Sequence, residues 1–342
     1  MKEPKKRDLF PDIIKGIAII LVVIGHSIQY GSGEHYFQSE SFFQNPLFKI
    51  IYSFHMPLFM LISGYFFYFS CNKYSFREGV ISRFTKVLLP VIVWAALYFI
   101  IKMLLNGEYL GIKATVIQYI KICITSIWFL WAVFFCSLAV LVVKHFFKDN
   151  IYVYLLLFLL TFVVPDFFII FLYKFMYPFF VLGYLYNKYK TKITWGKQGY
   201  WLVGFLLLYI VLMRFYVYDS FIYNGQYMHY NKDIPYQLYT DIYRLVVGLV
   251  GSVLVILILQ YIFKNRQNSK VAVLLGTLGV YSLGIYIITG YIQPLLLKVP
   301  FLEGFSYLNV FLVSLVVLVV SYGLTYLLRK VPVTNKLLLG GR

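Results

Sequence analysis

The chain has 342 residues, of which 61% are apolar, 21% aromatic and only 13% charged. This composition is typical of a protein dissolved in lipid and excludes an ordinary water-soluble domain. The excess of 31 Lys and Arg over 13 Asp and Glu has a natural place in the cytoplasmic loops of a membrane protein. We therefore expect no nucleic-acid partner.

Apolar segments of about 18–22 residues, enough to cross the hydrocarbon core, can be placed about ten times. The sequence thus predicts an all-α, polytopic membrane protein. It is interpreted as one integral-membrane domain over residues 1–342, with short tails at 1–11 and 329–342. Lys and Arg gather in alternate loops, so both termini are predicted to be cytoplasmic. The predicted spans are 12–30, 47–70, 84–105, 126–144, 151–165, 167–187, 199–217, 241–263, 271–296 and 306–328.

The first span carries three ionisable residues, Asp12, Lys15 and His26. Lys15 and His26 fall on one helical face, about 16 Å apart along the axis. Ionisable groups inside a span are functional candidates. With the N-terminus inside, Lys15 lies near the cytoplasmic surface and His26 in the outer half, where a neutral imidazole can act as a general base. The alternatives are a structural His26 and a Lys15 that snorkels to the interface, paired with Asp12.

The second span runs inward and carries His55 close to the outer surface. His26 and His55 are therefore expected in the same half of the membrane, as a base and its hydrogen-bonding partner. Gly25 and Gly64 would allow their helices to approach closely. Two histidines without a third ligand make a weak metal site, so no metal is predicted. The alternative is that His55 is an interfacial polar residue.

The third span begins with a basic cluster, Arg77, Arg83 and Lys86, on the same predicted side as Lys15. Such cations bind phosphate groups through charge-assisted hydrogen bonds. Ordinary positive-inside charge is the simpler interpretation of Arg77 and Lys86. Arg83 is the stronger candidate because it adjoins the apolar start of the helix.

The outer segment 219–233 is polar and aromatic, which suits packing on sugar faces, although an aromatic belt at the membrane interface explains it equally well. Cys71, Cys123 and Cys136 have no CxxC spacing and are interpreted as packing residues. The acidic residues expected in loops or at helix ends are Asp166, Asp219, Asp233 and Asp241.

Several motifs taken together carry a family resemblance. They are Asp12, Lys15-Gly16, Gly25-His26, Phe54-His55-Met56-Pro57, Ser63-Gly64-Tyr65, Arg83, Leu89-Pro90, Trp94, Trp128-Phe129-Leu130, Gly183-Tyr184 and Ser282-Leu283-Gly284-Ile285-Tyr286. The chain resembles the membrane-bound acyltransferase 3 family over essentially its whole length, in particular the stand-alone branch similar to fucose 4-O-acetylases. The specific signature is a basic residue separated by ten residues from a histidine, here Lys15 and His26.

The resemblance implies an O-acetyltransferase of the bacterial plasma membrane. It would move an acyl group, usually acetyl from cytoplasmic acetyl-CoA, to a hydroxyl of an extracytoplasmic or lipid-linked glycan. It assigns His26 to catalysis, and Lys15 with Arg83 to the acyl-CoA donor. One departure is Thr289, where the family often has a histidine. The remaining site predictions are His55 beside His26, Arg77 and Lys86 at the donor, and Asp12, Ser63, Tyr65, Trp128 and Tyr286 as supports.

Two questions stay open at this point. The acceptor hydroxyl could attack the thioester directly, or an acyl-His intermediate could form. From another class, a secondary transporter or exporter of a saccharide or small solute would also need about ten helices with buried ionisable groups. A channel or structural membrane protein would leave Lys15 and His26 unexplained.

Overall fold

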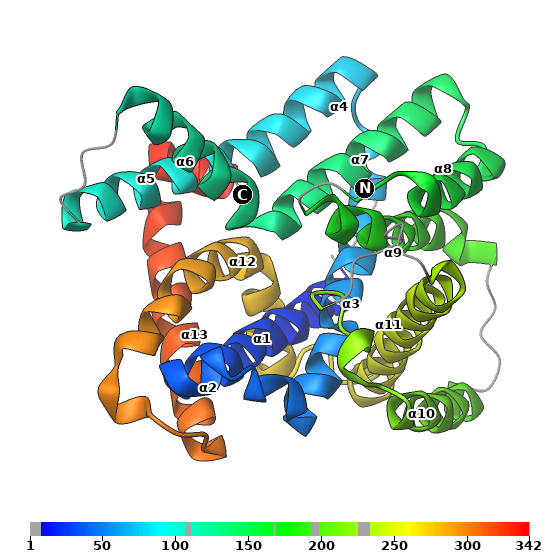
Figure 1. The fold of residues 1–342 in the computed structure, drawn as a ribbon. Helices are drawn as coiled ribbons and strands as arrows, with labels where there is room; N and C mark the ends of the chain where they lie inside the picture. Colours follow the sequence, from blue (N-terminus) through cyan, green and yellow to red (C-terminus); the bar gives the residue numbers. More distant parts are fainter. Residues whose placement is uncertain (1–7, 107–110, 167–168, 193–197, 225–232, 342) are drawn as a thin grey trace. The chain divides into compact units, whose positions relative to one another are not determined.

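The computed structural model describes residues 8–106, 111–166, 169–192, 198–224 and 233–341. Every regular element in these ranges is a helix (Figure 1). Seven helices are long and apolar enough to cross a membrane. The prediction of an all-α, polytopic membrane protein is confirmed. The seven candidate spans are Phe10–Tyr30, Pro46–Cys71, Phe76–Leu104, Trp128–Phe146, Ile234–Phe263, Lys270–Lys298 and Tyr307–Lys330.

The other three predicted spans are also helical, but each helix is too short or too polar to count as a complete membrane crossing. The helices α8 (Ile151–Val163) and α10 (Gln198–Arg214) have 13 and 17 residues. The helix α9 (Ile170–Tyr189) has 20 residues, but Lys174 and several tyrosines reduce its hydropathy. The count of ten crossings and the cytoplasmic placement of both termini remain predictions.

Contacts divide the chain into two compact units, and the division falls within α3 (Pro46–Cys71), after Ile62. Unit 1 comprises Met1–Ile62, Thr194–Tyr216 and Val246–Gly323, and unit 2 comprises Ser63–Ile193, Val217–Leu245 and Leu324–Arg342. The assignment of residues 1–342 to one domain stays a prediction. Unit 1 holds α1 (Phe10–Tyr30), α2 (Glu34–Gln38), α10, α12 (Lys270–Ile292) and parts of α3, α11 (Ile234–Phe263) and α13 (Tyr307–Lys330).

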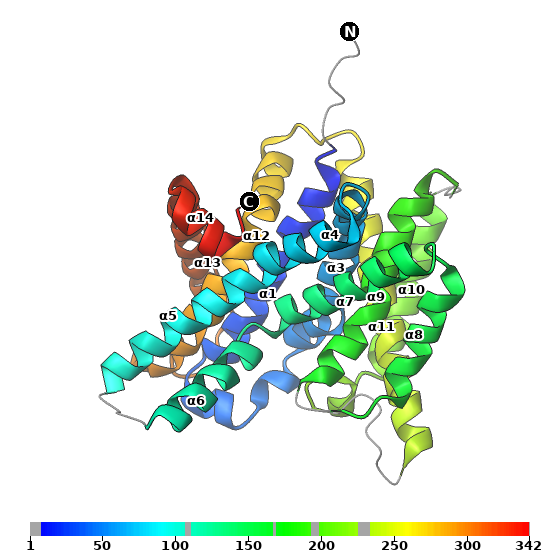
Figure 2. The same cartoon turned by 90° about the horizontal axis from the view of Figure 1, so that it is seen from above.

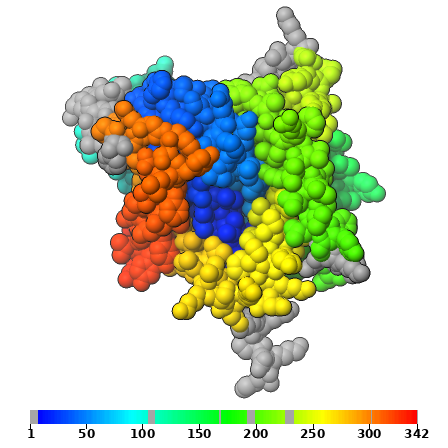
Figure 3. All heavy atoms as spheres, turned by 90° about the horizontal axis from the view of Figure 1, so that it is seen from below, coloured from blue at the N-terminus to red at the C-terminus, as the bar shows by residue number. Residues whose placement is uncertain are grey.

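Unit 1 is built on the close crossing of α1 and α12, which lie side by side in Figures 1 and 2. A Cβ on Gly16 would fall 2.0 Å from the carbonyl oxygen of Leu275, and one on Gly279 would fall 1.9 Å from that of Asp12. Only glycine permits backbones this close. In Figure 3 the dark-blue atoms of α1 are set back between α3 and the orange α13.

Unit 2 is organised around α7 (Trp128–Phe146), which packs on α9 and on α4 (Phe76–Arg83). The helix α4 continues through the π-helical turn η2 (Phe84–Leu88) into α5. The remaining helices of the unit are α5 (Leu89–Asn106), α6 (Ile112–Thr125), α8 and α14 (Pro332–Leu339), with the beginning of α11 and the ends of α3 and α13.

Several boundaries differ from the predictions. The third helical segment begins at Phe76, because Ser75 and Glu78 form a capping box there. Arg83 therefore lies inside a continuous helix and not at its start. The tail predicted at 329–342 contains α14, whose Leu338 carbonyl accepts a hydrogen bond from Trp94 at 3.0 Å. Two further differences are α6, where no helix was predicted, and α11, which begins at Ile234.

Candidate active site

The site begins with α1, an uninterrupted helix of 21 residues with Pro11 and Asp12 in its first turn. Proline suits the first turn because no intrahelical bond is lost, and an acidic residue complements the helix dipole. The unbroken helix preserves the predicted spacing, about 16 Å along the axis, between Lys15 and His26. Both side chains are half-buried, whereas Asp12 is buried.

His26 belongs to a polar cluster with Gln29 and Tyr52, all within unit 1. Its Nδ1 lies 3.3 Å from Gln29 Oε1 and 3.3 Å from the Tyr52 hydroxyl, which itself donates to Gln29 Oε1 at 3.3 Å. The imidazole stacks on Tyr30 with ring centroids 5.9 Å apart, and Tyr52 meets it edge-on at 6.3 Å. Three side chains therefore fix the plane of the ring.

His55 lies on the other side of Tyr52, with the two ring centroids 4.6 Å apart. Its Nδ1 contacts the carbonyl oxygen of Ile51 at 2.8 Å, and the side chain is 2% exposed. Because a carbonyl only accepts, Nδ1 carries the proton and Nε2 keeps a lone pair. Unit 1 thus gathers both predicted histidines around one tyrosine, which the sequence reasoning did not include.

The two glycines expected between the histidine helices act differently. A Cβ on Gly25 would fall 2.7 Å from Tyr52 Cε2, so the absence of a side chain makes room for the tyrosine ring. A Cβ on Gly64 would instead fall 1.9 Å from the carbonyl oxygen of Phe180 in α9. The predicted role of Gly64 in bringing the histidines together is therefore wrong, and its close contact is internal to unit 2.

Gln293 adds a buried amide next to α1. Its Nε2 donates to the Val23 carbonyl at 2.9 Å and to Ser27 Oγ at 3.0 Å, while its Oε1 has no hydrogen-bond partner in the described part of the chain. Thr289, in the position where the family often has a histidine, is fully buried and lies 3.2 Å from the Ser321 hydroxyl.

The predicted donor cations of unit 2 lie in different environments. The Arg83 side chain is 9% exposed and its guanidinium sits 5.0 Å from the Phe67 ring centroid. The half-buried Lys86 lies over the ring of Tyr74 at 5.5 Å. Arg77 is exposed. Of the three, Arg83 is the most buried.

The predicted supporting residues are divided between the units. Tyr65 in unit 2 is half-buried, and its hydroxyl accepts a hydrogen bond from Lys190 at 3.1 Å. Trp128 begins α7 and meets the Tyr223 ring edge-on at 6.2 Å. Ser63 in unit 2 and Tyr286 in unit 1 are half-buried.

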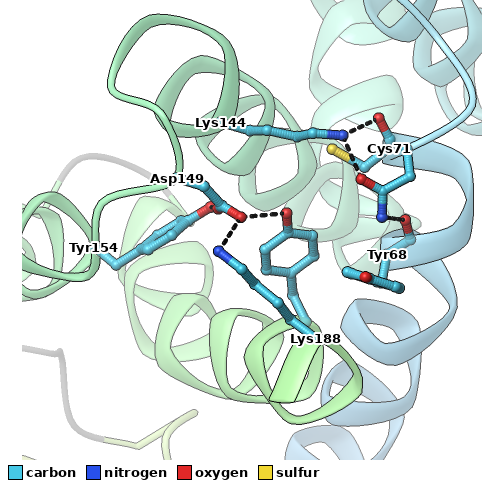
Figure 4. Close-up of polar contacts among 8 residues, drawn as sticks. Tyr68, Cys71, Lys144, Asp149, Tyr154 and Lys188 are labelled. Carbon is cyan, nitrogen blue, oxygen red and sulfur yellow. Dashed lines mark hydrogen bonds and ion pairs between the residues drawn. The ribbon is translucent and has the colours of Figure 1, made fainter. Parts of the chain in front are cut away.

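Sequence reasoning missed a charged cluster around Asp149 in unit 2 (Figure 4). Its carboxylate pairs with Lys188 and accepts hydrogen bonds from the hydroxyls of Tyr154 and Tyr184, at 2.5 and 3.1 Å for the two tyrosines. Asp149 adopts a left-handed backbone conformation with φ of 61°. Tyr184 and Lys188 lie 35 and 39 residues further along the chain, so no local spacing revealed their contacts with Asp149.

A buried ion pair lies about two turns into α11. Arg244 and Asp241 are 2.9 Å apart, with side chains 2% and 0% exposed, and the guanidinium also donates to the Asp219 carbonyl. The prediction that Asp241 lies in a loop or at a helix end is wrong. The spacing of three residues on one helical face was a usable signal.

The predicted acceptor segment 219–233 is described only at its ends, and residues 225–232 lie outside the described ranges. Tyr236 donates to Asp219 Oδ2 at 3.0 Å. Among the side chains that the structure describes, no group of three His, Cys, Asp or Glu gathers as metal ligands would.

Comparison with known proteins gives a family match and two relatives. The family model described as "Acyltransferase domain" matches residues 8–330. Nodulation protein NolL of Sinorhizobium fredii is 39% identical over 127 residues, which cover 37% of this chain and 34% of that protein. Nodulation protein NolL of Mesorhizobium japonicum is 37% identical over 147 residues, covering 43% and 39%. The chain thus matches little more than a third of the length of either relative. No solved structure matches.

Proposed function

This chain belongs to the acyltransferase-domain family, matched over residues 8–330, and on that premise we propose that it is a membrane O-acetyltransferase. The predicted family and its broad class of enzyme are thereby confirmed. The proposed reaction moves an acetyl group from cytoplasmic acetyl-CoA to a hydroxyl of an extracytoplasmic or lipid-linked glycan. The proposed location is the plasma membrane of a bacterium.

The observation that carries the proposal is the environment of His26. Its Nδ1 faces Gln29 Oε1, an atom that only accepts, so Nδ1 carries the proton and Nε2 is the basic nitrogen. A neutral imidazole with a defined basic nitrogen is what general-base catalysis requires. His55 lies on the far side of Tyr52 and is proposed as the second histidine of this site.

In the proposed reaction His26 Nε2 takes the proton from the acceptor hydroxyl. The oxygen attacks the thioester carbonyl carbon and forms the new C–O bond, and the tetrahedral intermediate collapses as the C–S bond breaks. The CoA thiolate leaves and takes up the proton from the imidazolium. An acetyl-His intermediate divides the same bond changes into two steps.

Lys15 is proposed to bind the phosphates of the donor, because it lies on the face of α1 that carries His26 and about 16 Å away from it along the axis. CoA is a polyanion with a long thin arm, so its phosphates would bind the lysine while the thioester reaches the histidine. Arg83, with Arg77 and Lys86, keeps its predicted donor role in unit 2 as part of the proposal.

The deciding experiment incubates membranes with radiolabelled acetyl-CoA and measures labelled glycan. His26→Ala should abolish transfer while the protein remains inserted at normal levels. His145→Ala is the control, because that exposed histidine lies in unit 2, outside the His26 cluster, and contacts only the Leu141 carbonyl and an aromatic ring among the contacts described. Full transfer by His26→Ala would refute the mechanism. Solute movement without covalent transfer by the wild type would favour the transporter alternative.

The donor assignment has its own measurement. Lys15→Ala should raise the KM for acetyl-CoA several-fold with a smaller change in kcat, because a phosphate contact serves ground state and transition state alike. The exposed Lys113→Ala should leave both constants unchanged. An unaltered KM in Lys15→Ala removes this lysine from the donor site.

A further inference from the structure

The side chain between the two histidines is Tyr52, and its position is determined from several sides. Its ring stacks on Phe48 with centroids 3.8 Å apart and lies against His55 at 4.6 Å. Gly25 leaves room for the edge of the ring. The phenol oxygen consequently reaches α1 at a defined place, between His26 and Gln29.

The orientation of the Gln29 amide, with Oε1 toward both His26 and Tyr52, sets the direction of the hydrogen bonds at this place. Gln29 Oε1 accepts from the Tyr52 hydroxyl, and it also accepts from His26 Nδ1. The Nδ1 proton of His26 therefore lies between two oxygens, that of the amide and that of the phenol, each 3.3 Å away. Together, the Gln29 amide and the Tyr52 hydroxyl fix both the tautomer and the plane of the His26 imidazole.

We propose that Tyr52 and Gln29 are positioning residues of this enzyme, which hold His26 with its Nε2 nitrogen as the proton acceptor. The inference rests on the proposed acetyl transfer and extends it by two residues from different helices. Neither residue is proposed to touch the substrates. Each acts through His26, as the third member of a catalytic triad acts through its histidine.

The test compares two Tyr→Phe variants, each of which removes only a hydroxyl group. Tyr52→Phe removes the contact to His26, while Tyr209→Phe removes a buried hydroxyl that bonds Ser53 at 2.8 Å in the same unit. Tyr52→Phe should lower kcat about tenfold, equivalent to about 1.4 kcal/mol, and should change the KM for acetyl-CoA less than twofold. Tyr209→Phe should keep kcat within twofold.

Gln29→Leu supplies the second arm, because the amide contacts the same nitrogen. Alone it should also lower kcat about tenfold. Combined with Tyr52→Phe, the loss should be clearly less than the product of the two, since residues that act as a unit are not additive. Losses that multiply are expected of residues that do not act through a common group.

The outcomes separate this inference from the proposed function. Wild-type kcat in Tyr52→Phe, an equal loss in Tyr209→Phe, or multiplying losses in the double variant would each overturn the positioning role. The proposed function would still stand in those cases if the wild type transfers label and His26→Ala does not. Absence of transfer by the wild type would overturn both.

Discussion

Replacing Gly25 by alanine should disturb the His26 site without removing a polar atom. The added Cβ would fall 2.7 Å from Tyr52 Cε2, and ordinary contact begins at 3.4 Å, so the ring edge must retreat by about 0.7 Å. The Tyr52 hydroxyl contacts are already 3.3 Å long. A retreat of this size stretches them to about 4 Å, beyond hydrogen-bonding distance.

Two opposing effects set the stability of Gly25→Ala. Overpacking costs about 1–3 kcal/mol, whereas alanine gains about 0.5–1 kcal/mol over glycine inside a helix. We expect a net loss of about 1 kcal/mol in the free energy of unfolding. We expect kcat to fall about tenfold, equivalent to about 1.4 kcal/mol, because the displaced ring carries the hydroxyl away from His26.

The assay measures kcat by labelled acetyl transfer and thermal unfolding of the same detergent-solubilised protein. Gly290→Ala in α12 is the control, because its Cβ would meet no atom within 4 Å, and it should be neutral or slightly stabilising. In the Tyr52→Phe background, Gly25→Ala should add little further loss of kcat. Normal kcat in Gly25→Ala with reduced stability would refute the coupling of ring position to catalysis.

Three further predictions concern stability. Gly279→Ala should lower the melting temperature more than Gly25→Ala does, because its Cβ would fall 1.9 Å from the Asp12 carbonyl oxygen. A melting temperature equal to that of Gly290→Ala would contradict the close crossing of α1 and α12. Asp149→Asn should lower stability by about 1–3 kcal/mol, since three donors lose a charged acceptor, and an unchanged melting temperature would argue against the cluster. Asp241→Asn should cost about 3 kcal/mol or more, because it removes the carboxylate charge that pairs with the buried guanidinium of Arg244. A loss below about 1 kcal/mol in chemical denaturation would contradict the importance of that ion pair.

The positions of the helices were predictable because hydropathy alone locates segments that must lie in lipid. The site was predictable in part. Lys15, His26 and His55 are polar residues in apolar helices, and such residues stand out in any sequence. Tyr52 did not stand out, because tyrosine is common throughout this chain and its contact with His26 spans 26 residues.

Local signals for some missed features were nevertheless present. Gln29 follows His26 by three residues and Tyr52 precedes His55 by three, a spacing that places side chains together on a helix. Ser75 and Glu78 have the spacing of a capping box, which marks where α4 begins. The Asp149 cluster had no such signal, because Tyr184 and Lys188 reach it only when α9 packs beside the connection between α7 and α8.

The π-helical turn η2 has a consequence for the basic cluster beside it. A π turn accommodates one residue more than an α turn, so everything after Leu88 is rotated by about 100° relative to a continuous α-helix. The extra residue is absorbed within Phe84–Leu88, so deleting one residue there would restore regular α-helical winding while α4 and α5 keep the faces that they now present. A deletion elsewhere in α4 or α5 would instead turn every later residue of the helix by about 100° about its axis, so the π turn is the one place in this segment where the chain can lose a residue and keep the basic cluster and Trp94 in their present relative positions.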